Sequence, residues 1–209
     1  MIDYEVIKNC DFPVLKVNNF LDEKKLSDIK DEIRLISKDA THFELGIREH
    51  ERVFVDDYYN GRRDESSILR HVSEKLFSDG MYDVYNSIPD TAFHLIRSST
   101  YHETQLTFYK NTNQYEWHGD NINKRICNWI LYVDVDSDFT GGENQISNSV
   151  WDEESMSTVH NVDISTKPKD NLLLIMPSWV THSVAPVFMK SNDLLKGRIT
   201  VNGHIGFRT

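Results

Sequence analysis

Residues 109–121 read Tyr-Lys-Asn-Thr-Asn-Gln-Tyr-Glu-Trp-His-Gly-Asp-Asn and contain the spacing His118-x-Asp120. In an extended strand, residues i and i+2 point to the same face, so an imidazole and a carboxylate at this spacing can bind one metal ion together. The pair alone is weak evidence, because nine histidines and 33 acidic residues among 209 would give about one such pair by chance. A metal site therefore needs a third ligand from another part of the chain.

His182 is the best candidate for that third ligand. It follows the apolar run 172–176 and a turn at 177–179, and it begins a further short strand. Two histidines and one carboxylate on one side of an ion leave three adjacent positions open. That arrangement suits Fe(II) when the ion must also bind an oxidant and a chelating cosubstrate. The predicted metal ligands are therefore His118, Asp120 and His182.

Arg198 and Thr200 share one face of a predicted strand, 198–207. A guanidinium that points into a β core is costly unless it meets an anion, and its planar fork beside a hydroxyl suits a carboxylate. An arginine on a solvent-facing edge strand would explain the same pattern without a ligand. We keep the anion-binding interpretation as the stronger one.

The remainder of the chain indicates an α+β fold that is mainly β. An opening strand is expected within 3–17, and Asp22 is the expected N-cap of a helix with apolar positions 26, 29, 33 and 36. Two further helices are expected at 64–78, ended by Gly80, and at 81–88. Eight short strands then predict a sandwich or barrel with the helices outside it: 93–98, 105–109, 126–135, 143–147, 158–164, 171–176, 182–187 and 198–207. No linker-like segment divides the chain, so we expect one domain over residues 1–209, with 1–92 as a helical support region and 93–209 as the β core.

Composition narrows the possible partners. The net charge of −10 argues against a protein whose main task is to bind duplex nucleic acid. The N-terminus has no basic region followed by an apolar one, and no apolar run approaches the length of a membrane helix. We therefore expect a cytoplasmic protein, in which Cys10 and Cys127 are buried thiols. The sequence makes no prediction of oligomeric state.

From about residue 93 to residue 207 the sequence resembles the Fe(II)/2-oxoglutarate-dependent dioxygenases, and within them the prolyl 4-hydroxylase-like branch. Five motifs occur in the family's order over about 100 residues. They are the run Tyr109, Tyr115, His118 and Asp120; the strand 125–134; Gly141-Gly142-Glu143; the strand 168–177 leading to His182; and Arg198 with Thr200. Short members of this family occur in bacteria and their viruses, and this chain resembles them.

The chain also departs from the family's pattern. Thr112 stands where a turn glycine is frequent, Trp117 replaces a common proline, and Asn144 follows Gly-Gly-Glu where threonine or leucine is frequent. The segment 188–196 enlarges the hairpin before Arg198. These differences leave the expected chemistry in place and concern the substrate.

The resemblance implies a double-stranded β-helix, the jelly-roll or cupin-like core, behind N-terminal support helices. It implies Fe(II), 2-oxoglutarate and O2, with ascorbate as a candidate reductant. The distal carboxylate of 2-oxoglutarate is expected at Arg198 and Thr200, together with the hydroxyl of Tyr109 or Tyr132. The branch often uses lysine for this task, so Lys190 and Lys196 are alternatives to Arg198. No separate acid or base is expected beside the metal.

The expected reaction is hydroxylation of a C–H bond with release of succinate and CO2. Peptidyl proline is the preferred substrate. The alternatives are the same chemistry on a free amino acid, another small molecule or a nucleobase, and a non-enzymatic metal- or ligand-binding β-barrel module. Tyr115, Trp117, Asn121 and Asn128 are the expected substrate-side residues.

Two loops, 46–63 and 139–162, are expected to select the substrate. The segment 52–63 is either a lid or substrate edge, or a plain surface loop. The other histidines are expected to be structural or on the surface: His42, His50, His71, His94, His102, His160 and His204.

Overall fold

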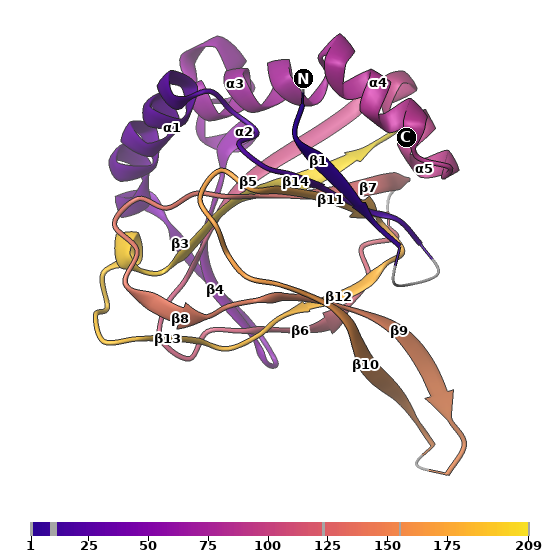
Figure 1. Cartoon of the computed structure of the whole chain (residues 1–209). Coiled ribbons are helices and arrows are strands. Elements are labelled where there is room, and N and C mark those ends of the chain that lie inside the picture. The colour runs from indigo at the N-terminus through magenta and orange to yellow at the C-terminus, as the bar shows by residue number, and fades with distance from the viewer. Residues whose placement is uncertain (1, 9–11, 123, 155, 209) are drawn as a thin grey trace.

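A large antiparallel sheet and a smaller one face each other, and helices cover the outer face of the larger sheet (Figure 1). The computed structural model describes residues 2–8, 12–122, 124–154 and 156–208. The large sheet has the order β1 (Tyr4–Ile7), β2 (Val14–Val17), β11 (Leu173–Pro177), β7 (Arg125–Tyr132), β14 (Arg198–Gly206), β5 (Tyr101–Tyr109), β4 (Arg48–Phe54) and β3 (Thr41–Leu45). The mainly β fold expected from the sequence is thereby confirmed.

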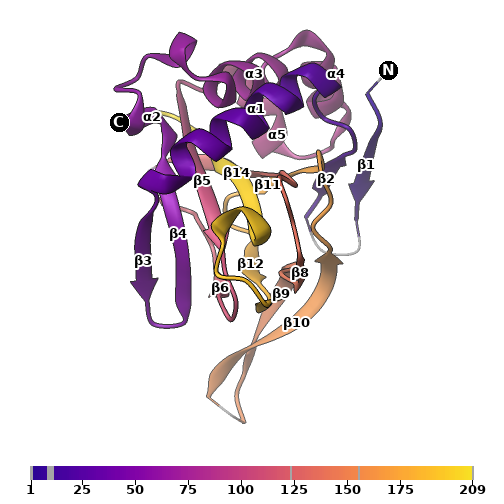
Figure 2. The same ribbon diagram turned by 90° about the vertical axis from the view of Figure 1, so that its left-hand side faces the viewer.

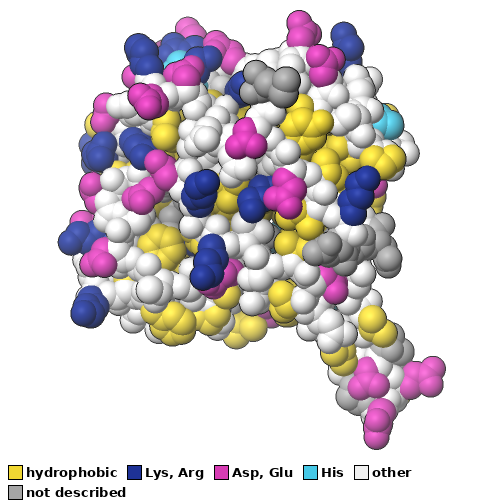
Figure 3. Space-filling model, in the orientation of Figure 1, with side chains coloured by type: hydrophobic (Ala, Val, Ile, Leu, Met, Phe, Trp, Pro, Cys, Tyr) yellow, Lys and Arg dark blue, Asp and Glu magenta, His cyan; other side chains and the backbone are white. Residues whose placement is uncertain are grey.

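The smaller sheet has the order β10 (Ser157–Thr166), β9 (Asn144–Asp152), β12 (Thr181–Val184) and β6 (Tyr115–His118). A two-stranded sheet of β13 (Val187–Met189) and β8 (Phe139–Gly141) lies beside it. The β9–β10 hairpin projects from the body, as Figure 2 shows from the side. Acidic side chains cluster at its tip (Figure 3).

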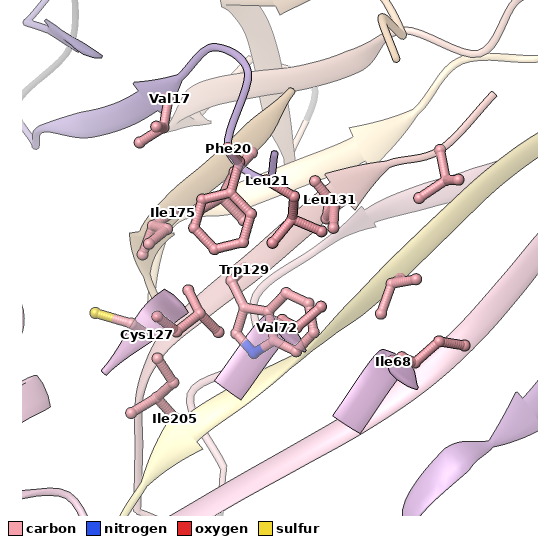
Figure 4. Close-up of a cluster of buried hydrophobic side chains, with 14 of the residues drawn as sticks. Val17, Phe20, Leu21, Ile68, Val72, Cys127, Trp129, Leu131, Ile175 and Ile205 are labelled. Carbon is pink, nitrogen blue, oxygen red and sulfur yellow. The ribbon is translucent and has the colours of Figure 1, made fainter. Parts of the chain in front are cut away.

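The helices are α1 (Glu23–Ile36), α2 (Val55–Tyr58), α3 (Ser67–Leu76), α4 (Asp79–Ser87) and α5 (Thr91–Leu95). As expected, Asp22 caps α1 by accepting a hydrogen bond from the backbone N–H of Lys25. Side chains of α3 and of the segment before α1 pack on Trp129 and its neighbours in the sheet (Figure 4). Burial of this apolar face attaches the helices to the sheet and leaves the opposite sheet face to form the site. The described helices include no candidate for a membrane-spanning segment.

The prediction of a strand at 93–98 is wrong. These residues form the end of α5 and a 3-10 turn at Ile96–Ser98. Asp90 caps the helix by accepting from the N–H of Ala92, and Phe93 and Ile96 are both fully buried at helical spacing. Gly80 also does not end a helix, because it lies inside α4, which Ser78 caps.

Other differences concern strands. The pair β3 and β4 lies in the region expected to be helical support, and β6 and β8 were not expected either. The strand expected at 182–187 is divided into β12 and β13 by Ala185 and Pro186, which belong to neither strand. Cys127 is a buried free thiol whose pKa burial raises, whereas Cys10 lies outside the described residues.

Candidate metal centre

β6 and β12 pair so that His118 and His182 are direct cross-strand partners. Asp120 follows β6, and its backbone N–H donates to the carbonyl of Ser178 over 2.8 Å, which holds the carboxylate beside β12. One ligand atom from each of the three residues lies within 4.8 Å of the others. His118 Nε2 is 3.8 Å from Asp120 Oδ1, and His182 Nε2 is 3.6 Å from Asp120 Oδ2. The fold therefore brings the three sequence-predicted ligands together.

Hydrogen bonds fix both imidazoles in the form that binds metal. His118 Nδ1 lies 2.8 Å from the carbonyl oxygen of Glu116, and His182 Nδ1 lies 3.0 Å from that of Val180. Because a carbonyl oxygen only accepts, Nδ1 of each ring donates, and Nε2 is the ring nitrogen that faces Asp120. Burial, and then the neighbouring His182, lower the pKa of His118 to about 3. Two Nε2 atoms and a carboxylate that face one gap fit a divalent metal ion.

A second layer of polar groups holds Asp120. Asn128, which is 3% exposed on β7, donates its side-chain N–H to Asp120 Oδ2 over 2.8 Å. His204 on β14 donates from Nδ1 to the Asn128 amide oxygen over 3.0 Å. Burial lowers the pKa of His204 to about 4, so its ring is neutral. Asn128 was expected to contact substrate, but its amide is already bound to Asp120 and His204.

Arg198 forms an anion site deep in the same fold. It is 1% exposed, and its Nε donates to the carbonyl of Gly142 over 2.8 Å. Its Cζ lies 4.8 Å from the ring centroid of Tyr109 and 5.1 Å from that of Tyr132. Within the described ranges, no carboxylate forms an ion pair with it, and the buried hydroxyl of Tyr132 has no hydrogen-bond partner. A buried cation beside an unpaired hydroxyl fits the carboxylate tail of a ligand.

The neighbours of Arg198 explain its position. Gly142 has φ +70°, and a Cβ there would lie 2.8 Å from Arg198 Cδ, so a larger residue would displace the guanidinium. Thr200 donates to the side-chain oxygen of Asn202 over 3.1 Å. The alternatives Lys190 and Lys196 do not line the cavity described next.

A cavity of about 450 Å³ between the two sheets contains the metal ligands and Arg198. One wall is β4, from which Arg48, His50, Arg52 and Phe54 line the cavity at alternate positions. His50 is 3% exposed, and neither of its ring nitrogens has a hydrogen-bond partner in the described structure. Its pKa is lowered to about 4, first by burial and then by Arg52. The sequence indicated the segment 46–63 as a substrate-selecting loop, but it did not predict that these residues form a strand in the cavity wall.

The expected substrate-side residues divide into two groups. Tyr115 lines the cavity, with its ring 4.4 Å from that of His118. Trp117 instead stacks on His160 of β10, with centroids 5.0 Å apart, and does not line the cavity. Asn121 is exposed outside the lining.

The family model described as the 2OG-Fe(II) oxygenase superfamily matches residues 104–206. This segment contains the three candidate metal ligands and Arg198. No curated protein sequence matches the chain.

Solved structures share the fold. A prolyl-4-hydroxylase from Pseudomonas putida has a TM-score of 0.57 and 15% identity, with 95% of each chain covered. A prolyl hydroxylase from Trichoplax adhaerens, in complex with a hypoxia inducible factor oxygen degradation domain peptide fragment, has a TM-score of 0.63 and 14% identity over 92% of this chain and 83% of that one. The non-heme alpha ketoglutarate dependent epimerase SnoN from nogalamycin biosynthesis has a TM-score of 0.51 and 12% identity over 92% and 76%. At such identities the likeness shows the fold and leaves the substrate open.

Proposed function

Since residues 104–206 belong to the 2OG-Fe(II) oxygenase superfamily, we propose that the protein hydroxylates a C–H bond of a substrate, with Fe(II), 2-oxoglutarate and O2, and releases succinate and CO2. The observation on which this depends is the geometry of His118, Asp120 and His182. Their ligand atoms lie within 4.8 Å of one another, and in both imidazoles Nδ1 is bound to a backbone carbonyl, so that Nε2 is the nitrogen available to a metal. We also propose that the whole chain acts as one catalytic domain.

His118, Asp120 and His182 would hold the metal through two Nε2 atoms and a carboxylate oxygen. The chemistry supplied by Fe(II), when bound, is the activation of dioxygen, which no protein side chain can perform. Asn128 would keep the carboxylate of Asp120 in its orientation through the 2.8 Å hydrogen bond. The three ligands line the cavity, so a metal ion that they hold would be accessible to the cosubstrate and to the substrate.

Arg198 would bind the distal carboxylate of 2-oxoglutarate. Its guanidinium is buried and has no acidic partner in the part of the chain that the structure describes, so a ligand carboxylate would supply the missing counter-ion. The hydroxyl of Tyr132, or that of Tyr109, would donate to the same carboxylate, since burial raises the pKa of both and keeps them protonated. Thr200 would assist only if its hydroxyl turned away from Asn202.

The walls of the cavity would exclude water from the reacting groups. The two sheets face each other across it, and Tyr115 and Ile130 are among the side chains that line it. Exclusion of water strengthens the electrostatic interactions of Asp120 and Arg198 and protects reactive species from side reactions.

For the substrate we propose peptidyl proline. The order of the motifs supports it, and so does the fold shared with two prolyl hydroxylases, one of them in complex with a peptide fragment. A small molecule is the second candidate, because an epimerase of nogalamycin biosynthesis has the same fold. Ascorbate would serve as the reductant that keeps the metal as Fe(II).

Turnover tests the proposal. Purified protein with Fe(II), 2-oxoglutarate and air is incubated with proline-containing peptides and with free amino acids, and succinate and the gain of one oxygen atom are measured by mass spectrometry. The expected result is succinate formation that matches substrate hydroxylation. His118→Ala should abolish it, whereas His160→Ala, which alters a histidine outside the cavity, should retain it. Iron-independent succinate formation, or equal activity of His118→Ala, would refute the proposal.

A further inference from the structure

One cation in the cavity remains without a counter-ion. Arg52, on β4, pairs in register with Thr107 of β5 and lines the cavity beside His50 and Phe54. Its Cζ lies 4.1 Å from the ring centroid of Phe43 and 4.6 Å from that of Phe54. These aromatic contacts hold the guanidinium in place. No ion pair of Arg52 is found among residues 2–8, 12–122, 124–154 and 156–208.

Two other arginines that line the cavity have carboxylate partners. Arg48 Nε lies 2.8 Å from Glu116 Oε1. Arg125 lies 3.3 Å from Glu103 Oε2, which also accepts a hydrogen bond from the hydroxyl of Tyr101. Glu103 is the only carboxylate in the described lining other than Asp120, so the lining offers Arg52 no free anion.

The metal and the cosubstrate do not supply the missing charge. A divalent ion, the carboxylate of Asp120, the guanidinium of Arg198 and the two carboxylates of 2-oxoglutarate sum to zero. Arg52 then remains as one net positive charge in the wall of a cavity within a protein of net charge −10. Desolvation lowers the pKa of Arg52 and outweighs the opposing effect of Glu103, whose carboxylate is already bound to Arg125.

His50 is a second unpaired polar group on the same strand face. It lies two residues before Arg52, it is buried, and both of its ring nitrogens are without partners. A neutral imidazole can donate one hydrogen bond to an anion. The cavity wall therefore offers a guanidinium and an N–H donor at adjacent inward positions.

We propose that Arg52, with His50 beside it, binds a carboxylate of the substrate, so that the protein acts on a substrate with an acidic group close to the oxidised carbon. This inference rests on the proposed function of the metal centre. Facing sheets lie about 10 Å apart, and extended chain advances about 3.3 Å per residue. An anion held at β4 therefore lies within about three residues of a carbon at the metal. The carboxylate belongs either to an acidic side chain next to the target residue in a peptide or to a free amino acid.

Binding to the protein loaded with Mn(II) and 2-oxoglutarate tests the inference without turnover. The probes are two matched pairs: the peptides acetyl-Gly-Glu-Pro-Glu-Gly-amide and acetyl-Gly-Gln-Pro-Gln-Gly-amide, and L-proline with L-prolinamide. Calorimetric titration should show that the acidic member of at least one pair binds at least about 10-fold more tightly than its neutral partner. The pair that shows the preference identifies the source of the carboxylate.

Three variants assign the preference to Arg52. Arg52→Gln should abolish it, and Arg52→Lys, which keeps the charge, should retain most of it. Arg97→Gln is the matched control, because Arg97 is an exposed arginine over the ring of Tyr82, outside the cavity. It should retain the full preference. Thermal unfolding of each variant checks that the fold is intact.

The outcomes also separate this inference from the proposed function. If the Mn(II)-loaded protein does not bind 2-oxoglutarate, the proposed function fails. If it binds 2-oxoglutarate but binds the acidic and the neutral member of each pair with equal affinity, only the substrate inference fails. The same conclusion follows if it binds neither member of either pair. The substrate inference also fails if the preference survives in Arg52→Gln. It fails as well if Arg52→Gln weakens the binding of 2-oxoglutarate more than tenfold, since Arg52 would then belong to the cosubstrate site.

Discussion

Replacement of Asn128 by alanine should weaken the binding of a divalent metal ion by about 10- to 100-fold. The Asn128 side chain donates to Asp120 Oδ2 over 2.8 Å and is itself oriented by His204 over 3.0 Å. A hydrogen bond to a charged group contributes about 1.5–3 kcal/mol, which corresponds to about 10- to 100-fold in affinity. Without this bond, Asp120 Oδ2 is free to turn away from the position that faces His182.

The assay is titration of the metal-free protein with Mn(II), followed by calorimetry. Asn202→Ala is the matched control, since Asn202 is an amide on the same sheet face that bonds to Thr107 and Thr200 instead of a metal ligand. His204→Ala should give a smaller loss than Asn128→Ala, because it removes only the bond that orients the amide. Unchanged affinity in Asn128→Ala, or an equal loss in Asn202→Ala, would show that the hydrogen bond from Asn128 does not hold Asp120 for metal binding. Equal melting temperatures of the metal-free variants would exclude a general loss of structure.

Three further predictions concern the anion site, the buried histidines and a glycine. Arg198→Met should weaken 2-oxoglutarate binding by about 100-fold without lowering the melting temperature of the metal-free protein, because it removes a buried charge that has no counter-ion; a clear fall in melting temperature would contradict this. The pKa values of His50, His102, His118 and His204 are lowered to about 3–4 in the folded state, so the unfolded chain binds more protons below about pH 6.5. The free energy of unfolding should therefore fall as the pH falls, by on the order of 2 kcal/mol per histidine at pH 5. Urea unfolding of the metal-free protein measures it, and equal free energies at pH 7 and pH 5 would contradict this prediction. Gly142→Ala should lower the free energy of unfolding by about 1–3 kcal/mol and also weaken 2-oxoglutarate binding, whereas Gly46→Ala, at a similar φ of +63° with open space around it, should leave that binding unchanged; equal effects on binding would argue against the contact with Arg198.

The metal ligands could be predicted from the sequence because their local geometry is simple. His118 and Asp120 stand at a spacing that places both on one side of the strand end, and His182 begins a strand directly after a buried apolar one. The helix after Asp22 was predictable for a similar reason, since a capping carboxylate precedes apolar residues at helical spacing. In both cases the decisive information lies within a few residues.

The hairpin of β3 and β4 could not be predicted in this way. The inward positions of β4 are occupied by the polar residues Arg48, His50 and Arg52, because this side of the strand faces a polar cavity instead of an apolar core. The alternation of apolar and polar residues that identifies a half-buried strand is therefore missing. The error at 93–98 has a different cause: the run is apolar enough for a strand, and only the cap at Asp90 and the contacts of Phe93 and Ile96 with the core make it helical.

The same reasoning applies to the second layer around the metal. Asn128 and His204 lie 76 residues apart in the chain. They meet only because β7 and β14 pair in a register that places the two residues opposite each other. A strand pairing of this kind depends on the whole sheet and leaves no local pattern in the sequence.

In the proposed function, His118, Asp120 and His182 would hold a metal ion to which 2-oxoglutarate binds, while Arg198 would hold the distal carboxylate of 2-oxoglutarate. Titration of 2-oxoglutarate into the metal-free protein and into the Mn(II)-loaded protein measures how far its binding depends on the metal. We predict one 2-oxoglutarate per chain, with an affinity at least about 10-fold higher when the metal is present, and loss of this metal dependence in Asp120→Ala. Equal affinity with and without metal, or the same metal dependence in Asp120→Ala, would contradict the account.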